Sequence, residues 1–203
     1  MYTLYYMPGG SSFGIHALLV ELKQKYTLKF YGDIPNYLEI NPTGGVPTLE
    51  DDGMIIREGA AIALHLIEKH DSNLLPTSRP ERTEALQWLM MANASIHPAY
   101  GKMFFIANNV KDEKLKIELF QAQAETISDM WQIVNKQLEG KAFICGDEPT
   151  VADFLLPVYA NWSRFFPVKI NYGSNFLSYC VKMMQYPSFA KAISVENIEY
   201  SVL

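Results

Sequence analysis

The stretch from Asn41 to Gly53, NPTGGVPTLEDDG, constrains the fold more than any other part of the chain. Two adjacent glycines, Gly44 and Gly45, adopt positive φ at little steric cost, so the chain can turn sharply in front of a short apolar strand. Pro47 has no N–H to donate to a sheet and permits a cis peptide bond at low cost. A cis bond after Val46 would turn the Val46 N–H and C=O outward, toward an extended peptide ligand.

A hairpin and a helix follow this turn. Residues 51–53, Asp-Asp-Gly, are typical of a hairpin turn, and a second strand is expected at 54–56. The sequence EGAAI then opens a helix expected over residues 59–70. An ordinary β-hairpin followed by a helix, without any ligand site, explains this stretch equally well when it is taken alone.

The residues before the hairpin predict a strand, a helix and a second strand. Residues 2–7, YTLYYM, and 26–31, YTLKFY, are β-prone and aromatic. Between them, apolar residues recur at helical spacing from Ile15 to Leu22, which predicts an amphipathic helix over 12–25. The order β-α-β followed by β-β-α is that of a thioredoxin-like domain, expected over residues 1–75.

Helical patterns dominate the rest of the chain. A polar stretch, DSNLLPTSRP, predicts a linker after His70. From residue 81 onward we expect a long helix bent near Pro98, and another that Gly140 ends. Thr150 and its neighbours predict a capping box, and a last helix starts at Pro187. The sequence therefore predicts an all-α domain over residues 81–203.

Composition and charge limit the classes of function. The chain has 203 residues, of which 49% are hydrophobic and 19% charged, as in ordinary globular proteins. Its net charge of −5 argues against nucleic acid as a partner. No apolar run reaches the roughly 18 residues of a membrane-spanning helix, and the N-terminal residues lack the basic region of a signal peptide. Because Cys145 and Cys180 match no metal spacing, we expect a reduced, cytoplasmic protein without a metal.

Three separated motifs resemble the glutathione-binding half of the glutathione S-transferase superfamily. N-P-x-G-x-V-P-x-L, then D-G, then E-G-A-A-I occur in the order of that superfamily. The segment from Gly146 to Asp153 looks like its capping motif in the helical domain, and YPSFAKAI looks like its final helix. The resemblance covers nearly the whole chain. It implies the glutathione transferase fold, glutathione as co-substrate, and a homodimer, to which we expect Ala61, Leu64 and Met91 to contribute apolar surface.

The N-terminus MYTLYYMPGGSSFGIH is similar to that of the bacterial beta class. Ser11 stands where that class has a cysteine, and Tyr6 and His16 match the residues that flank it. His97 stands where the class has a histidine that contributes to the active site. The resemblance therefore implies Ser11 as the group that contacts the sulfur, with Ser12 in reserve, and with Tyr6 and His97 as further catalytic residues.

The chemistry of conjugation requires a thiolate. A free thiol has a pKa of about 8.5 and is mostly protonated at neutral pH. A hydroxyl donor and the positive end of a helix both favour the thiolate, and Ser11 at a helix start can supply both. Ser11 and Ser12 can alternatively serve only as N-caps of that helix. One serine can also cap while the other donates.

The remaining glutathione contacts are expected from the backbone edge and from the start of the 59–70 helix. Gly45, Val46 and Pro47 form the edge. Glu58 can accept from the ligand amine, and the free N–H groups at Gly59 can bind its carboxylate. The superfamily more usually has Ser at the position of Gly59, so one hydroxyl donor is missing. The segment 32–39 is also short, which indicates that the usual second helix is trimmed.

Other residues have two readings. His97 is either a site residue or a packed helix residue, and Glu58 either binds ligand or complements the helix dipole. Trp88, Trp131 and Trp162 are expected in the core. A group of aromatic residues can line an apolar substrate pocket or pack in the core: Tyr100, Phe104, Phe105, Tyr159, Phe165 and Phe166.

Three functions fit the sequence. The first is a glutathione transferase that conjugates the thiolate to small apolar electrophiles. The second is a glutathione-dependent reductase or peroxidase, which needs a protein thiolate near the first helix. Neither Cys145 nor Cys180 lies there. The third is a non-catalytic binding module of the same fold.

Overall fold

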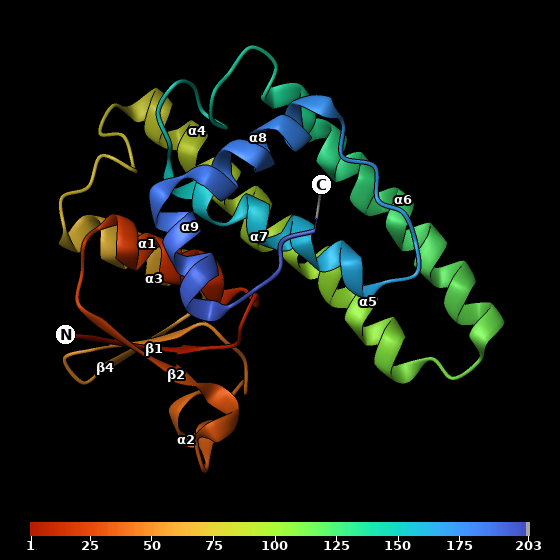
Figure 1. Cartoon of the computed structure of the whole chain (residues 1–203), viewed down its shortest axis with the longest axis horizontal. Helices are drawn as coiled ribbons and strands as arrows, with labels where there is room; N and C mark the ends of the chain where they lie inside the picture. The colour runs from red at the N-terminus through yellow and green to blue at the C-terminus, as the bar shows by residue number, and fades with distance from the viewer. Residues whose placement is uncertain (202–203) are drawn as a thin grey trace.

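The computed structural model describes residues 1–201. Four strands lie in the first 57 residues and form a sheet of order β2-β1-β3-β4. β1 (Tyr2–Tyr6) pairs parallel with β2 (Tyr26–Phe30) and antiparallel with β3 (Thr48–Asp51), which pairs antiparallel with β4 (Met54–Arg57). The predicted thioredoxin-like order is confirmed, because α1 (Ser12–Glu21) and α3 (Gly59–Lys69) both lie on one face of this sheet (Figure 1).

The segment between β2 and β3 is short. It forms a 3-10 turn at Tyr31–Asp33 and the single helical turn α2 (Tyr37–Ile40), on the sheet side opposite α1 and α3 (Figure 1). The predicted trimming of the second helix is confirmed, because α2 has only 4 residues. The Val46–Pro47 peptide bond that follows is cis.

The helix predicted over residues 12–25 begins at Ser12 as expected, but it is shorter than predicted and is not amphipathic. α1 ends at Glu21, and every residue from Ser12 to Leu19 is buried. The reason is that α1 lies between the sheet and α9 (Pro187–Glu196), so both of its faces are covered. At Gly14 the packing is so close that a Cβ atom would lie 2.5 Å from the Phe154 carbonyl oxygen.

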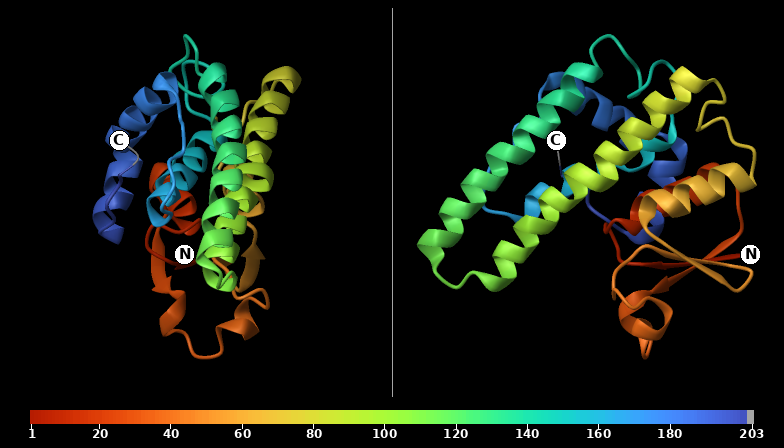
Figure 2. Two further views of the ribbon diagram at one scale, coloured as in Figure 1. Left: turned by 90° about the vertical axis from the view of Figure 1, so that its right-hand side faces the viewer. Right: turned by 180° about the vertical axis from the view of Figure 1, so that it is seen from behind.

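The helical part is built around two long antiparallel rods (Figure 2). One rod consists of α4 (Arg79–Met90), a π-helical segment (Met91–Ile96) and α5 (His97–Asn109). The other is α6 (Glu113–Gln137), which packs against α5. The sequence predicts a bend near Pro98; the structure has a change of helical geometry there, directly before His97, because proline lacks the N–H of a regular α-helix. It takes the form of a π-helical segment.

Shorter helices complete the helical part. They are a 3-10 turn at Val151–Phe154, α7 (Leu156–Ala160), a 3-10 turn at Asn161–Phe165, α8 (Ser174–Gln185) and α9. The predicted capping box is present at the first of these turns, where the Thr150 N–H donates to Asp153 at 2.7 Å. Beyond β4 the described residues contain an isolated β-bridge between Phe143 and Gly146 but no sheet strand. The all-α prediction for this part is therefore confirmed.

The stretch predicted as a polar linker is partly packed. Leu74 and Leu75 are buried, and the Leu74 carbonyl accepts the Val151 N–H at 2.8 Å. α4 begins at Arg79, two residues before the predicted start at residue 81. The two parts share one continuous hydrophobic core that includes Trp88 and Trp131, as expected.

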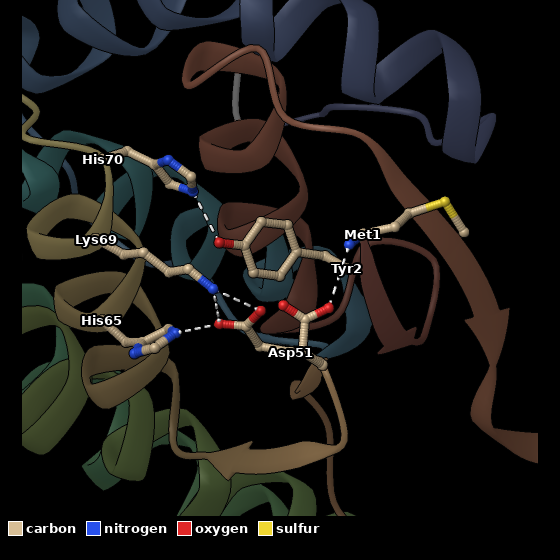
Figure 3. Close-up of polar contacts among 7 residues, drawn as sticks. Met1, Tyr2, Asp51, His65, Lys69 and His70 are labelled. Atoms are coloured by element: carbon tan, nitrogen blue, oxygen red, sulfur yellow. Dashed lines mark hydrogen bonds and ion pairs between the residues drawn. The ribbon is translucent and has the colours of Figure 1, made fainter.

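An ion-pair cluster ties the far end of β3 to the last turns of α3 (Figure 3). The buried Asp51 carboxylate accepts from Lys69 Nζ at 2.7 and 2.8 Å and bonds His65 Nε2 at 2.7 Å. Burial raises the pKa of Asp51, but the hydrogen bonds from Lys69 and His65 outweigh it, so that pKa lies below its ordinary value. This cluster ties α3 to the C-terminal end of the interior strand β3, which is the end away from Pro47.

Candidate functional site

Two adjacent pockets open between the sheet part and the helical part of the chain. The first, called the apolar pocket here, has a volume of about 380 Å³ and is lined by Met7, Pro8, Gly9, Ser11, Tyr31, Gly44, Gly45, Val46, His97, Gly101, Phe104, Trp162 and Phe165. The second, the polar pocket, has a volume of about 170 Å³ and is lined by Ser11, Asn41, Thr43, Gly45, Val46, Pro47, Arg57, Glu58, Gly59, Asn93 and His97. Ser11, Gly45, Val46 and His97 line both.

Ser11 lies where the two pockets meet. It stands at the N-terminal end of α1, where the backbone N–H groups of a helix have no partner within the helix. Its hydroxyl does not cap the helix. It donates instead to the Val46 carbonyl oxygen at 2.7 Å. The hydroxyl of Ser11 therefore joins the helix start to the backbone edge before Pro47.

Ser12 and Tyr6 are not brought to either pocket. The Ser12 side chain is fully buried, accepts from the Met7 N–H at 3.1 Å and donates to the Met7 carbonyl at 3.2 Å. Neither serine caps α1 with its side chain, so that expectation is wrong. The Tyr6 ring packs edge-on against Phe30, with centroids 6.4 Å apart. Ser12 therefore holds the backbone of Met7 in the loop before Ser11, and Tyr6 packs against β2.

The loop that leads to Ser11 is held by the helical part. The Gly9 N–H donates to Glu196 Oε2 at 3.0 Å, and the Gly9 carbonyl accepts from the Trp162 indole at 2.9 Å. The other Glu196 oxygen bonds His16 Nδ1 at 2.7 Å, and His16 Nε2 bonds the Tyr26 hydroxyl at 2.9 Å. The Glu196 and His16 side chains are fully buried. His16 therefore acts through the loop and reaches neither pocket.

The backbone edge is supported from behind. The Gly45 carbonyl accepts from the Tyr37 hydroxyl at 2.9 Å and from the Asn41 amide at 2.8 Å. Both donors are buried, and Asn41 also bonds Thr48 at 3.0 Å. These bonds fix the loop that carries Gly45, Val46 and Pro47, all of which line the polar pocket.

Glu58 and Gly59 line the polar pocket beside this edge, since a Cβ atom built on Gly59 would lie 3.8 Å from Pro47 Cγ. Glu58 is exposed, lines the polar pocket and has a φ of 70°, which is uncommon for a residue with a side chain. Residues held in sparsely populated backbone regions concentrate at ligand sites. Gly59 is buried at the first position of α3 and lines the same pocket. The predicted glutathione-binding residues are therefore gathered in one place.

His97 lies at the start of α5 and faces both pockets. Its ring centroid is 5.0 Å from that of Tyr159 and 5.3 Å from that of Trp162. Burial lowers the pKa of His97 below its ordinary value, against the opposing charge of Glu58. The ring is therefore uncharged at neutral pH and can take part in a hydrogen bond but not in an ion pair.

Several lining residues were missed by the sequence analysis. Arg57, Asn41, Thr43 and Asn93 belong to the polar pocket, and Tyr31 to the apolar one. Arg57 directly precedes Glu58, and Asn93 precedes His97 by four residues. Their closeness in the sequence to predicted site residues was the signal that could have found them. Trp162 is buried as predicted, yet its ring also lines the apolar pocket.

The aromatic group divides between the two readings. Phe104 and Phe165 line the apolar pocket, with ring centroids 6.1 Å apart. Tyr100, Tyr159 and Phe166 are buried in the core, whereas Phe105 is exposed. The apolar pocket is therefore walled by rings from α5 and from the 3-10 turn that ends at Phe165.

The cysteines lie outside both pockets. Burial raises the pKa of the half-buried Cys145 to about 11 and raises that of the buried Cys180 further. Both thiols are therefore protonated at neutral pH. Within residues 1–201 no three potential ligand side chains cluster to hold a metal ion. No helix in that part of the chain is long and apolar enough to span a membrane.

The fold and the pockets define a class of protein in which a thioredoxin-like domain with a cis-proline edge at a polar pocket adjoins a helical domain with an apolar pocket. Residues 1–68 match the model of the glutathione S-transferase N-terminal domain, and residues 84–177 match that of the C-terminal domain. The chain belongs to the glutathione S-transferase family.

Individual relatives agree over nearly the full length. The chain is 29% identical to the glutathione S-transferase GstA of Escherichia coli O157:H7, over 97% of this chain and 99% of that protein. It is 26% identical to a glutathione transferase from Methylococcus capsulatus, whose crystal structure superposes with a TM-score of 0.84 over 97% of this chain and 99% of that one. A Pseudomonas fluorescens family member with two glutathione bound, 20% identical, shares the fold with a TM-score of 0.78 over 95% and 92% of the two chains.

Proposed function

We propose that this glutathione transferase activates the thiol of its co-substrate glutathione with the Ser11 hydroxyl and transfers the thiolate to a small apolar electrophile. The observation that carries the proposal is the position of Ser11, between the polar pocket, the apolar pocket and the start of α1. A ligand that fills the polar pocket with its peptide part and points its sulfur toward the apolar pocket passes Ser11.

The binding mode follows from the groups on each wall. The cysteinyl backbone of glutathione pairs with the N–H and C=O of Val46, and the γ-glutamyl amine faces Glu58 in the polar pocket. The Val46 carbonyl already accepts the Ser11 hydroxyl at 2.7 Å. When the cysteinyl N–H of glutathione binds that carbonyl, the Ser11 hydroxyl is released to rotate and donate to the sulfur.

The thiolate is favoured in two ways. A hydroxyl bond to a charged acceptor is stronger than one to a neutral acceptor, so the bond from Ser11 favours the ionised sulfur. The free N–H groups at the start of α1 add a partial positive charge. Ser11 keeps its own proton throughout and donates a hydrogen bond only. His97 is neutral and serves as a hydrogen-bonding wall of both pockets, without charge.

The electrophile occupies the apolar pocket. Phe104, Trp162 and Phe165 supply ring faces, and Gly101 leaves space between them. Such walls favour a compact apolar or aromatic molecule with a leaving group that points toward Ser11. Conjugation then forms the carbon–sulfur bond as the leaving group departs with its electron pair.

A homodimer and a cytoplasmic location belong to the same proposal. Ala61, Met54 and Met90 are exposed, and Leu64 and Met91 are half-buried, so α3, β4 and α4 carry apolar surface available to a second copy. Two reduced cysteines suit a reducing compartment. Sedimentation at micromolar concentration tests the dimer, and a species of about 23 kDa would contradict it.

Binding and conjugation assays test the function. We expect the protein to be retained on glutathione-agarose, to be eluted by free glutathione, and to conjugate glutathione to a chloronitrobenzene-type electrophile. A protein that binds glutathione but conjugates nothing across a panel of electrophiles would be a binding module. A reductase or peroxidase is disfavoured, because the two cysteines lie outside both pockets and have raised pKa values.

A further inference from the structure

The polar pocket contains a pair of opposite charges that the sequence analysis did not bring together. Among the described residues that line either pocket, Arg57 is the only lysine or arginine, and Glu58 is the only carboxylate. Both are exposed, and they are neighbours in the chain. His97 adds no charge at neutral pH, since burial lowers its pKa. The pocket therefore presents one fixed cation and one fixed anion.

The Arg57 side chain is anchored with donors to spare. One Nη donates to the Ile40 carbonyl at the end of α2, at 2.6 Å. A guanidinium carries five N–H donors in a planar fork, so four remain after this bond. A carboxylate is the group that such a fork binds best, because two parallel hydrogen bonds form at once. The anchor holds the fork over the polar pocket before a ligand arrives.

Asn93 lies next to Gly59 in the lining of the polar pocket. It lies on the π-helical segment Met91–Ile96 and is half-buried. A Cβ atom built on Gly59 would lie 3.2 Å from Asn93 Oδ1, which is closer than an ordinary contact. The amide of Asn93 therefore occupies the space into which a side chain at position 59 would project. The Asn93 side chain forms no hydrogen bond within residues 1–201, so its amide is free to turn by 180° and present Nδ2 in place of Oδ1 to a ligand beside Gly59.

The π-helical segment explains why a residue of the helical part reaches this place. Such segments are rare and are frequently found at functional sites. Here the segment ends directly before His97, and both Asn93 and His97 face the polar pocket. The irregular turn thus carries a side chain of the helical part to the first turn of α3.

We propose that Arg57 and Asn93 together bind the α-carboxylate of an α-amino-acid head group in the polar pocket, while Glu58 binds its ammonium. The proposal rests on the proposed function, since the γ-glutamyl end of glutathione is such a head group. In this chain Asn93 takes the place of a side-chain donor at position 59. The carboxylate lies between the Arg57 fork, the Asn93 amide and the N–H groups of the first turn of α3.

Calorimetric titration with glutathione and two analogues tests the assignment. 4-Aminobutyryl-cysteinyl-glycine lacks the α-carboxylate, and glutaryl-cysteinyl-glycine lacks the amine. We expect Arg57→Gln and Asn93→Ala each to weaken glutathione binding by about 10-fold or more. Both variants should bind the carboxylate-free analogue as the wild type does. Arg82→Gln, which removes a half-buried arginine paired with Glu68 outside both pockets, is the matched control and should change nothing.

A compensating pair adds a readout that general damage to the pocket would not produce. Gly59→Ser alone should weaken binding, because its side chain meets Asn93. In Asn93→Ala/Gly59→Ser the space is free and the serine hydroxyl supplies a donor, so the double variant should bind glutathione more tightly than Asn93→Ala. Gly59 has no positive φ, so the backbone tolerates serine.

The outcomes separate this proposal from the function on which it rests. If the wild type does not bind glutathione, both are overturned. If it binds and conjugates glutathione but Arg57→Gln and Asn93→Ala bind as the wild type does, only the carboxylate site is overturned. Equal losses for glutathione and for the carboxylate-free analogue would likewise overturn it, because Arg57 would then bind the glycyl carboxylate or only support the loop.

Discussion

Replacing Ser11 by alanine isolates the thiol-activating bond from the rest of the site. The hydroxyl is the only group lost, and the backbone edge, Glu58 and the start of α1 remain. In the free protein the change removes a neutral hydrogen bond to the half-buried Val46 carbonyl, which water can replace. The loss of unfolding free energy should therefore be at most about 1 kcal/mol.

The effect on the bound thiol should be larger. A hydrogen bond to a charged acceptor is worth about 1.5–3 kcal/mol, and one pKa unit corresponds to about 1.4 kcal/mol. Ser11→Ala should therefore raise the pKa of bound glutathione by about 1–2 units, back toward the ordinary thiol value near 8.5. Below the wild-type pKa, conjugation should slow by about 10- to 150-fold. The ratio should shrink as the pH rises, because bulk hydroxide then ionises the thiol in both proteins.

The measurement is the pH profile of conjugation at saturating glutathione, together with ultraviolet titration of the bound thiolate. Ser11→Thr keeps a hydroxyl and should restore part of the pKa shift. Ser12→Ala is the matched control: it should lower the melting temperature, because both of its bonds to Met7 are lost, yet keep the thiol pKa. An unchanged thiol pKa in Ser11→Ala would refute the reasoning, and a raised one in Ser12→Ala alone would move the sulfur contact one residue along.

Three further changes probe the surroundings of the site. Glu196→Gln keeps the size of the side chain but removes its charge opposite His16. In urea titrations it should lower the free energy of unfolding by about 1–3 kcal/mol, and it should raise the thiol pKa of bound glutathione. If both quantities are unchanged, the role of the His16–Glu196 pair is contradicted. Asp51→Asn should make the free energy of unfolding depend less on pH in acid. Because its pKa is lowered in the fold, the Asp51 carboxylate stabilises the protein above its unfolded pKa near 4, and this contribution is lost as the pH falls through the folded pKa. A difference in unfolding free energy between pH 7 and pH 3 as large as that of the wild type would argue against it. Gly14→Ala should destabilise by about 1–3 kcal/mol despite the better helix propensity of alanine, since the new methyl meets the Phe154 carbonyl, and a raised melting temperature would show that the contact relaxes.

Much of the fold could be predicted from local patterns. Strand boundaries, the hairpin, the break near Pro98 and the capping box at Thr150 depend on neighbours in the sequence, so the residues themselves carry the signal. The amphipathic reading of the first helix failed because the face that it assigned to solvent is covered by α9, about 170 residues later in the chain. Long-range cover of this kind leaves no periodic trace in a single sequence.

The site divides in the same way. Glu58, Gly59 and the edge at Val46 follow from local motifs. Arg57 and Asn93 are near predicted site residues in the sequence, but their contacts with Ile40 and Gly59 depend on how α2, α3 and the π-helical segment meet in the fold. Ser11 and Ser12 are adjacent in sequence, and only the geometry separates a hydroxyl that faces both pockets from one bonded to Met7. The proposed division into residues 1–75 and 81–203 stays a prediction.

Both backbone polar groups of Gly9 form hydrogen bonds with the helical part: its N–H donates to Glu196, and its carbonyl accepts from Trp162. The two parts of the chain are therefore not interchangeable modules. A chimera that joins this sheet domain to a foreign helical domain would present Ser11 correctly only if the graft supplied a carboxylate and an indole at matching positions. Recombination between relatives must then carry residues 9, 162 and 196 as one unit, although nearly the whole chain separates the first from the last.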